Sequence, residues 1–221
     1  MPSLLTRWWR RFQNRVRVWA IETRTVCGFA VDVENYRTDI QTQTVVARLQ
    51  EALELIGRLD PRRLRRLRHD VARFWIVRYP TRGAFFPDAK ICMVELTFLA
   101  RTDLSIAQIA ACIVHEGAHA RLHSAGVRQE RLQRSAEERF CRRAELAFAS
   151  LLPADLAQPV LLRASDTIAA SDEEAAPDID WAEAFRRQRE VDIQSSRIPR
   201  WLKRLRLARI ARERASSSGA A

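Results

Sequence analysis

The chain has 221 residues, 47% of them hydrophobic, including nine Phe and six Trp. This composition excludes a globally disordered chain, and the length suits one domain with appendages or two small ones. The net charge is +11, but residues 1–20 carry +5 and residues 197–214 carry +7, so residues 21–196 carry −1. A nucleic-acid-binding core normally has a basic face, so this distribution argues against nucleic acid as a partner.

The first 20 residues place apolar side chains near one side of a helix and arginines on the other, which predicts a basic amphipathic N-terminal helix over 1–20. Apolar residues at helical spacing predict a helix over 43–57. Pro61 suits a first helical turn and opens a further predicted helix that runs to about residue 72.

Residues 74–77 and 91–96 are apolar runs typical of strands, and the segment between them contains two prolines and Gly83. We therefore expect a hairpin with a long loop. Ser105 and Gln108 have the spacing of a capping box at the start of a helix that ends near Gly126. Another helix is expected over 133–151. Helices around a strand pair predict a helix-rich α+β fold with a small antiparallel sheet.

The remainder of the chain is expected to form an acidic linker or loop at 161–180, then C-terminal helices and a tail over 181–221. The segment from Pro199 is again a basic amphipathic helix containing Trp201. Both basic ends resemble helices that lie on anionic membrane surfaces, and packing of their apolar stripes on the domain is the alternative. Residues 21–160 are the expected metal-binding domain.

Residues 115–119 have the sequence His-Glu-Gly-Ala-His. On a helix, positions i and i+4 lie about 40° apart, so the imidazoles of His115 and His119 can bind one cation. Glu116 is placed to accept a proton from a water at the metal, as a general base. The pattern therefore predicts a zinc site, and the alternative is a core helix whose histidines only form hydrogen bonds.

A closed structural zinc site would need further protein ligands, and Cys112 and Cys141 are the nearest thiols in the sequence. The metzincin pattern is excluded, because Leu122 and Ala125 stand where that class has Gly and His. His123 lies one turn past His119 and about 80° away from His115 around the helix. We expect it in a supporting or substrate-side position or exposed to solvent.

The next helix carries Glu138 and Glu145, seven residues apart on one face, with Cys141 and Arg142 between them on the same side. Acids buried among apolar residues need compensation, which a metal or Arg142 could supply. Cys141 and Arg142 are thus candidates for the surroundings of the metal.

A His-Glu-x-x-His motif followed by a Glu on the next helix resembles the gluzincin group of zinc metallopeptidases, over about residues 90–153. The resemblance implies a zincin-like fold and Glu138 as the third zinc ligand, with Glu145 as the competing choice. Arg142 stands where gluzincins usually have an Asp.

The sequence thus predicts a zinc-dependent hydrolase, more specifically a metallopeptidase acting on a peptide or protein. In such folds the strand before the active helix, here 91–96, can pair with an extended substrate. The alternative is a non-catalytic zinc protein that acts as a membrane-surface or regulatory interaction module. Four dispersed cysteines, the lack of an apolar run long enough to span a bilayer and the lack of a signal-peptide pattern favour the cytoplasm, with contact to the inner membrane face as an open alternative.

Overall fold

The computed structural model describes residues 21–127, 134–196 and 198–218. The chain divides after Pro177 into two compact units. The predicted N-terminal helix over 1–20 lies outside the described residues. No helix within the described ranges combines the length and the apolar character that crossing a bilayer requires.

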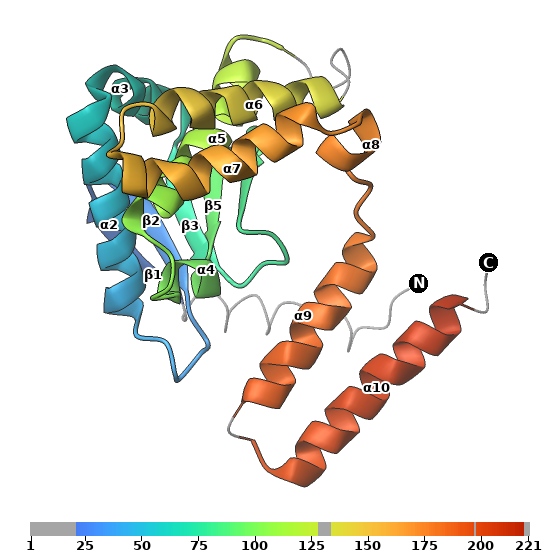
Figure 1. Ribbon diagram of the computed structural model, residues 1–221. Helices are drawn as coiled ribbons and strands as arrows, with labels where there is room; N and C mark the ends of the chain where they lie inside the picture. Colours follow the sequence, from blue (N-terminus) through green and yellow to red (C-terminus); the bar gives the residue numbers. More distant parts are fainter. Residues whose placement is uncertain (1–20, 128–133, 197, 219–221) are drawn as a thin grey trace. The chain divides into compact units, whose positions relative to one another are not determined.

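The first unit is an α+β fold, as the sequence predicts, built on a five-stranded sheet of order β1-β2-β3-β5-β4 (Figure 1). The strands are β1 (Ile21–Val26), β2 (Phe29–Glu34), β3 (Arg73–Val77), β4 (Gly83–Phe86) and β5 (Ile91–Glu95). The sheet is mixed, because β2, β3 and β5 are parallel neighbours while the outer pairs β1–β2 and β4–β5 are antiparallel.

The predicted hairpin between residues 74–77 and 91–96 is wrong. These segments are β3 and β5, which run parallel in register, with Phe74 opposite Cys92. The intervening segment, expected to be a loop, contains β4, which pairs antiparallel with β5 at the sheet edge. The expected antiparallel sheet is mixed because α2 and α3 form a helical crossover that lets β2 and β3 run in the same direction.

The pair β1–β2 was not predicted. The two strands meet at Cys27 and Gly28, both of which have positive φ angles, 49° and 80°. This conformation suits a tight two-residue hairpin turn, and Gly at the second position lowers its cost. Alternating buried residues in β2, namely Phe29, Val31 and Val33, then face the core.

The helices α2 (Thr42–Leu59), α3 (Pro61–Asp70), α5 (Ile106–Ser124) and α6 (Arg134–Ala149) confirm the predicted helices within a few residues. The Asp60 side chain caps α3 by accepting a hydrogen bond from the Arg63 N–H. Ser105 and Gln108 form the predicted capping box of α5. A short helix, α4 (Leu96–Ala100), separates β5 from α5, and Glu95 caps it.

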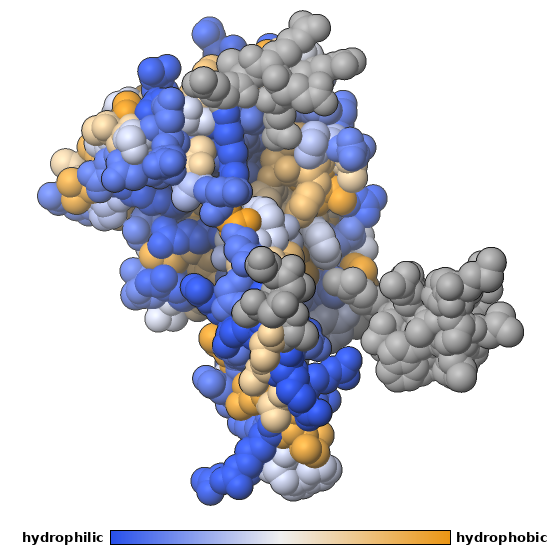
Figure 2. Space-filling model, turned by 90° about the vertical axis from the view of Figure 1, so that its right-hand side faces the viewer, coloured by the Kyte–Doolittle hydropathy of each residue, from blue (hydrophilic) through white to orange (hydrophobic). Residues whose placement is uncertain are grey.

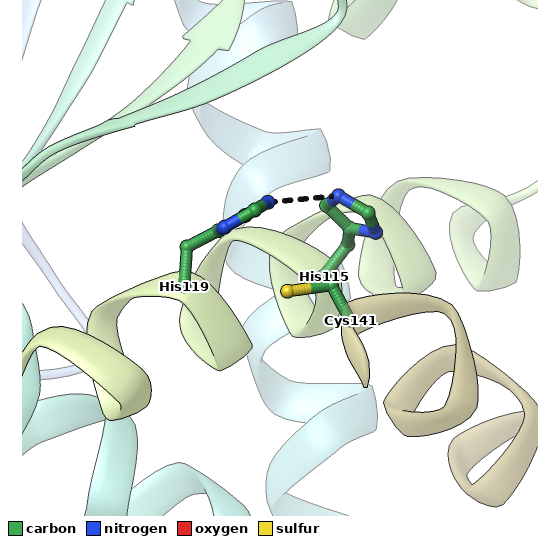
Figure 3. A group of neighbouring side chains, drawn as sticks. All are labelled: His115, His119 and Cys141. Carbon is green, nitrogen blue, oxygen red and sulfur yellow. Dashed lines mark hydrogen bonds between the residues drawn. The ribbon is translucent and has the colours of Figure 1, made fainter. Parts of the chain in front are cut away.

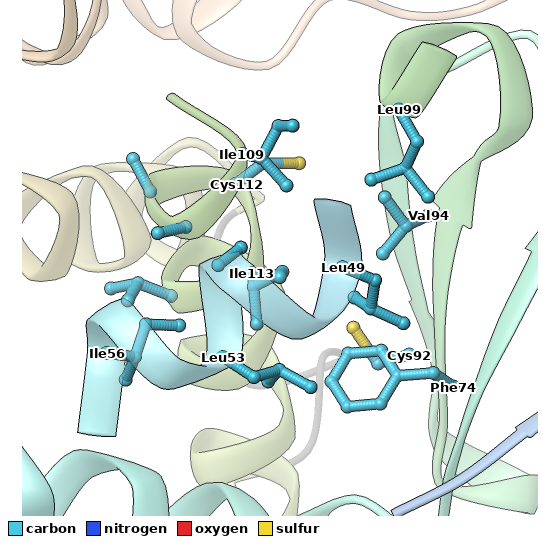
Figure 4. Packing of buried hydrophobic residues seen from close by; sticks show 14 of the residues in the cluster. Leu49, Leu53, Ile56, Phe74, Cys92, Val94, Leu99, Ile109, Cys112 and Ile113 are labelled. Carbon is cyan, nitrogen blue, oxygen red and sulfur yellow. The ribbon is translucent and has the colours of Figure 1, made fainter. Parts of the chain in front are cut away.

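The core lies between the sheet and helices α2 and α5. Figure 4 shows Leu53 of α2 and Ile113 of α5 packed towards Phe74 and Cys92 of the sheet. Helix α5 also contacts β4 and β5 on one side and α6 and α7 (Ala154–Ala169) on the other. Because α5 is held on both sides, the residues of its His-Glu-Gly-Ala-His motif have fixed positions between the sheet and α6.

The expected linker over 161–180 is largely helical. Residues up to Ala169 continue α7, and α8 (Asp172–Ala175) follows with a capping box from Ser171 and Glu174. Ala164 of α7 is fully buried. Burial of apolar residues in this acidic stretch therefore stabilises the helical conformation of α7.

The second unit is a pair of helices, α9 (Trp181–Ser195) and α10 (Arg200–Ser218), and α10 confirms the basic helix predicted from Pro199. Arg214 of α10 makes two contacts with the carboxylate of Glu183, of 2.8 and 3.2 Å. Ile210 is buried, whereas Trp201 and Leu205 are exposed. Figure 2 shows hydrophobic and hydrophilic side chains intermixed on the described surface.

Candidate metal centre

Helix α5 brings the two histidines of the motif together. Their Nε2 atoms are 3.2 Å apart and their ring centroids 4.9 Å apart. Figure 3 shows the two imidazoles above α5 with Cys141 of α6 beside them. His115 is buried, and His119 is partly exposed.

Helix α6 adds a carboxylate at the same point. One oxygen of Glu138 lies 3.3 Å from His115 Nε2, and its other oxygen lies 3.6 Å from His119 Nε2. Three potential ligand groups therefore converge, and these are the three that the resemblance to gluzincins implies.

The spacing of these atoms fits a tetrahedral zinc ion. Zinc binds imidazole nitrogen and carboxylate oxygen at about 2.0–2.2 Å, so two ligands at the tetrahedral angle are about 3.3–3.5 Å apart. The Nε2–Nε2 separation of 3.2 Å and the 3.3 Å from His115 Nε2 to Glu138 Oε2 are close to this value, and the 3.6 Å from His119 Nε2 is measured to the other oxygen, Oε1. The residues that the structure brings together therefore suit zinc in both donor type and spacing.

The outer nitrogens of both imidazoles face carboxylates of α6. Glu137 Oε1 is 2.8 Å from His119 Nδ1, and Glu145 Oε1 is 2.8 Å from His115 Nδ1. The Glu145 oxygen lies off the direction of the Nδ1–H bond, so this contact is an ion-pair contact and not a well-directed hydrogen bond. Carboxylates at these positions place the proton on Nδ1 and leave Nε2 as the lone-pair nitrogen.

A proton on each Nδ1 leaves the two Nε2 atoms, like the Glu138 carboxylate, as hydrogen-bond acceptors. When both rings are neutral and carry their proton on Nδ1, two Nε2 lone pairs and the Glu138 carboxylate face one another. Three acceptors at such distances repel one another unless a metal cation or an additional proton lies between them. In the ion-free chain, burial opposes the charge of His115, but its contacts with the carboxylates of Glu138 and Glu145 raise its pKa to about 9.

Cys141 is the nearest thiol to this centre. Its Sγ belongs to a group with His115 and His119 in which all ligand atoms lie within 4.8 Å of one another. The Glu138 oxygens lie 3.3 and 3.6 Å from the two Nε2 atoms, so Glu138 and Cys141 are both candidates for the third position. Burial raises the pKa of the Cys141 thiol, followed by repulsion from Glu138 and Glu116, so without a cation the group stays protonated.

Glu116 follows His115 in the sequence and lies on a different side of α5. It is buried, and burial raises the pKa of its carboxyl group. Strand β4 passes directly over it, because a Cβ added at Gly83 would lie 2.7 Å from Glu116 Oε1 and 3.0 Å from Cys112 Sγ. Gly83 is therefore the residue that lets the edge strand approach the predicted general base.

The other predicted residues lie farther out. Arg142 forms a salt bridge with Glu145, so the buried negative charge of Glu145 has a positive partner on the same helix, α6. Glu145 contacts the Nδ1 side of His115, away from the converging Nε2 atoms. His123 is exposed, and its ring lies against Phe85 of β4, with centroids 6.0 Å apart.

Glu137 was missed by the sequence analysis. A usable signal was present, because positions 137, 141 and 145 recur every four residues and so share one face of a helix. The sequence alone does not show which of the adjacent acids, Glu137 or Glu138, faces a histidine Nδ1 and which faces the two Nε2 atoms.

No known protein family matches the chain, and neither a curated protein nor a solved structure is significantly similar to it. The likeness to gluzincins therefore depends on the motif and on the positions of the donor atoms, and membership of that group stays a prediction.

Proposed function

We propose that the chain is a zinc-dependent hydrolase, and more specifically a metallopeptidase, in which His115, His119 and Glu138 hold the ion. The observation that carries this proposal is the convergence of two Nε2 atoms and one carboxylate within 3.2–3.6 Å. Two imidazole nitrogens and a carboxylate that converge on one point are the donor set of a zinc site, and in the ion-free chain the extra proton of His115 takes the place of the cation.

Bound zinc would supply Lewis acidity, which polarises a carbonyl group and lowers the pKa of water. Glu116 would then act as the general base, taking a proton from the attacking water and passing it to the leaving amine. Burial of this carboxyl group makes it a stronger base than an exposed glutamate. The contacts of Glu137 and Glu145 would hold the two imidazoles in the tautomer that binds metal.

A peptide substrate suits the strand that passes Glu116. The edge strand predicted from the sequence, residues 91–96, is wrong because β5 lies between β3 and β4. The edge strand on this side is β4, which uses one side to pair with β5. An extended peptide adding to β4 would place its backbone beside Gly83 and Glu116.

The test combines metal analysis with one conservative substitution. Purified protein should contain one zinc per chain and cleave members of a mixed peptide library. Glu116→Gln should keep the zinc and lose activity by about 10²–10⁴-fold, the usual contribution of a general base. Absence of zinc binding in the wild-type chain would refute the whole proposal, and full activity in Glu116→Gln would refute the assigned mechanism.

The second candidate is a non-catalytic zinc protein, favoured by the position of Cys141 near both histidines. A thiolate as fourth ligand would complete the coordination sphere and leave no position for water. The two candidates differ in whether the Cys141 thiolate binds the metal.

We also propose that α10 contacts anionic membranes peripherally. Trp201 and Leu205 are one turn apart on this helix and are 65% and 56% exposed, beside several exposed arginines. Trp with a cationic face is typical of helices at membrane interfaces. Replacing both residues with Ser in the full chain should reduce binding to phosphatidylglycerol vesicles, and unchanged binding would refute a role for this helix.

A further inference from the structure

A cavity of about 120 Å³ lies between α3 and the pair α5–α6. Its floor is apolar and buried, with Ile56, Leu67, Val114 and Ala118 contributing. Cavities of similar size, about 150 Å³, hold a benzene ring when they are apolar. Gly117 sets one wall, because a Cβ there would lie 2.8 Å from Leu67 Cδ1, so α3 can approach α5 closely at this point.

The rim of the cavity is cationic. Arg63, Arg66 and Arg121 line it, and Phe140 of α6 is 42% exposed at its edge. Arg63 is bound by Asp60, whereas Arg66 forms no hydrogen bond or ion pair with any residue that the structure describes. An unpaired guanidinium above an apolar cavity is suited to a ligand with an anionic head.

The carboxylate of Asp70 also lines the cavity, and its negative charge offsets part of the positive charge of the arginines. It is almost fully buried, with His69 Nδ1 at 2.9 Å and Arg121 Nη1 at 3.9 Å. Three guanidinium groups face two carboxylates, Asp70 and the Asp60 that pairs with Arg63, so the site keeps one net positive charge. The near-neutral sum of charges over residues 21–196 conceals this, because α3 alone carries five arginines in ten residues.

From these observations we propose that the cavity binds a small anionic amphiphile, a carboxylate or phosphate attached to an apolar group about the size of a benzene ring. The apolar group would lie against Leu67 and Val114, and the anionic head would pair with Arg66 and Arg121. The exposed ring of Phe140 would cover the junction between the two parts of the ligand.

The site is separate from the candidate metal centre. On α5, the cavity-lining positions 114, 118 and 121 lie about 60–120° around the helix from His115. On α6, Phe140 and Ala144 occupy positions next to the metal-facing ones. Binding at the cavity therefore does not require zinc or the proposed hydrolase activity, and it can be measured on the metal-free protein.

The experiment measures binding of 4-phenylbutyrate to the full chain by calorimetry and by NMR line broadening of the ligand, with 4-phenyl-1-butanol as the uncharged counterpart. We expect saturable binding of the carboxylate and at least tenfold weaker binding of the alcohol. Arg66→Gln should weaken binding of the carboxylate by about tenfold. Arg65→Gln is the matched control, since Arg65 is exposed on the same helix and does not line the cavity.

A second variant tests the apolar half of the site. Ala144→Leu fills the cavity from α6 and should abolish binding of both compounds while the circular dichroism spectrum stays unchanged. Competition between 4-phenylbutyrate and phosphatidylglycerol vesicles would indicate a lipid as the source of the anion, and saturable binding without competition would indicate a soluble one. Equal binding of acid and alcohol, or equal losses in Arg65→Gln and Arg66→Gln, would overturn the proposal.

Discussion

Glu137 and Glu145 lie eight residues apart on α6 and contact the Nδ1 atoms of two different histidines of α5, each at 2.8 Å. Two turns of one helix thus orient both imidazoles, and Glu138 between them supplies the third donor. The site depends on the register of α6 against α5 more than on any loop.

The first prediction concerns Glu137. Replacing it with Gln removes the negative charge beside His119 Nδ1 and weakens the preference for the metal-binding tautomer. We expect zinc affinity to fall by about 10–100-fold while the stoichiometry at saturating zinc stays at one. Competition with a chromophoric chelator measures this. Glu173→Gln, an exposed acid of α8, is the control and should leave the affinity unchanged.

The second prediction separates an open site from a closed one. If Glu138 is the third ligand, Cys141→Ala should retain one zinc with affinity within about tenfold of wild type, whereas Glu138→Ala should lose stoichiometric binding. Cobalt substituted for zinc should show no thiolate charge-transfer band. A strong band that disappears in Cys141→Ala would instead favour the closed, non-catalytic centre.

The third prediction concerns Gly83. Ala at this position places a methyl group 2.7 Å from Glu116 Oε1. Because this oxygen ends a flexible side chain, the cheapest adjustment is a shift of the carboxylate. We expect the free energy of unfolding to change by less than about 2 kcal/mol. Hydrolysis should fall much more strongly, with zinc retained. Ala84→Ser, on the opposite face of β4, should have little effect on either.

The fourth prediction concerns the buried pair Arg142–Glu145, whose side chains are 13% and 2% exposed. Glu145→Gln leaves the guanidinium without its ion partner and should lower the free energy of unfolding by about 3–5 kcal/mol. The double variant Glu145→Gln/Arg142→Met should recover a large part of this loss. Denaturant titrations in the presence of a chelator exclude any contribution from the metal.

The fifth prediction is a pH dependence of the α9–α10 pair. Hydrogen bonding from Arg214 lowers the pKa of Glu183 from its ordinary 4.5 to about 2. A lowered folded-state pKa means that the contact stabilises the pair above pH 4.5 and is lost as the pH falls from 4.5 towards 2. Hydrogen exchange of α10 amides, corrected for intrinsic rates, should show protection falling in this interval. Glu183→Gln should remove that pH dependence.

Local signals predicted the helices well. The capping box at Ser105, the Pro at the start of α3 and the apolar spacing of α2 each act within a few residues, so they are visible in a single sequence. The His-Glu-x-x-His motif is likewise local, since i and i+4 on one helix determine how His115 and His119 meet.

Pairing between distant segments was not predictable in the same way. Nothing near β3 indicates that its neighbours are β2 and β5, because strand order is decided by how helices α2 and α3 cross the sheet. The same limit applies to α6. The sequence shows which acids share a face, but only the docking of α6 on α5 determines that Glu138 meets two Nε2 atoms while Glu145 meets an Nδ1.

The division of the donors between two successive helices also has a temporal consequence. During synthesis α5 emerges first and offers two imidazoles, while the third donor and both supporting carboxylates follow together on α6. A nascent chain that stops before residue 138 can hold an ion by two ligands only. Stable binding of zinc would therefore require that α6 has been synthesised and has folded against α5. A chain released before that point would bind zinc weakly.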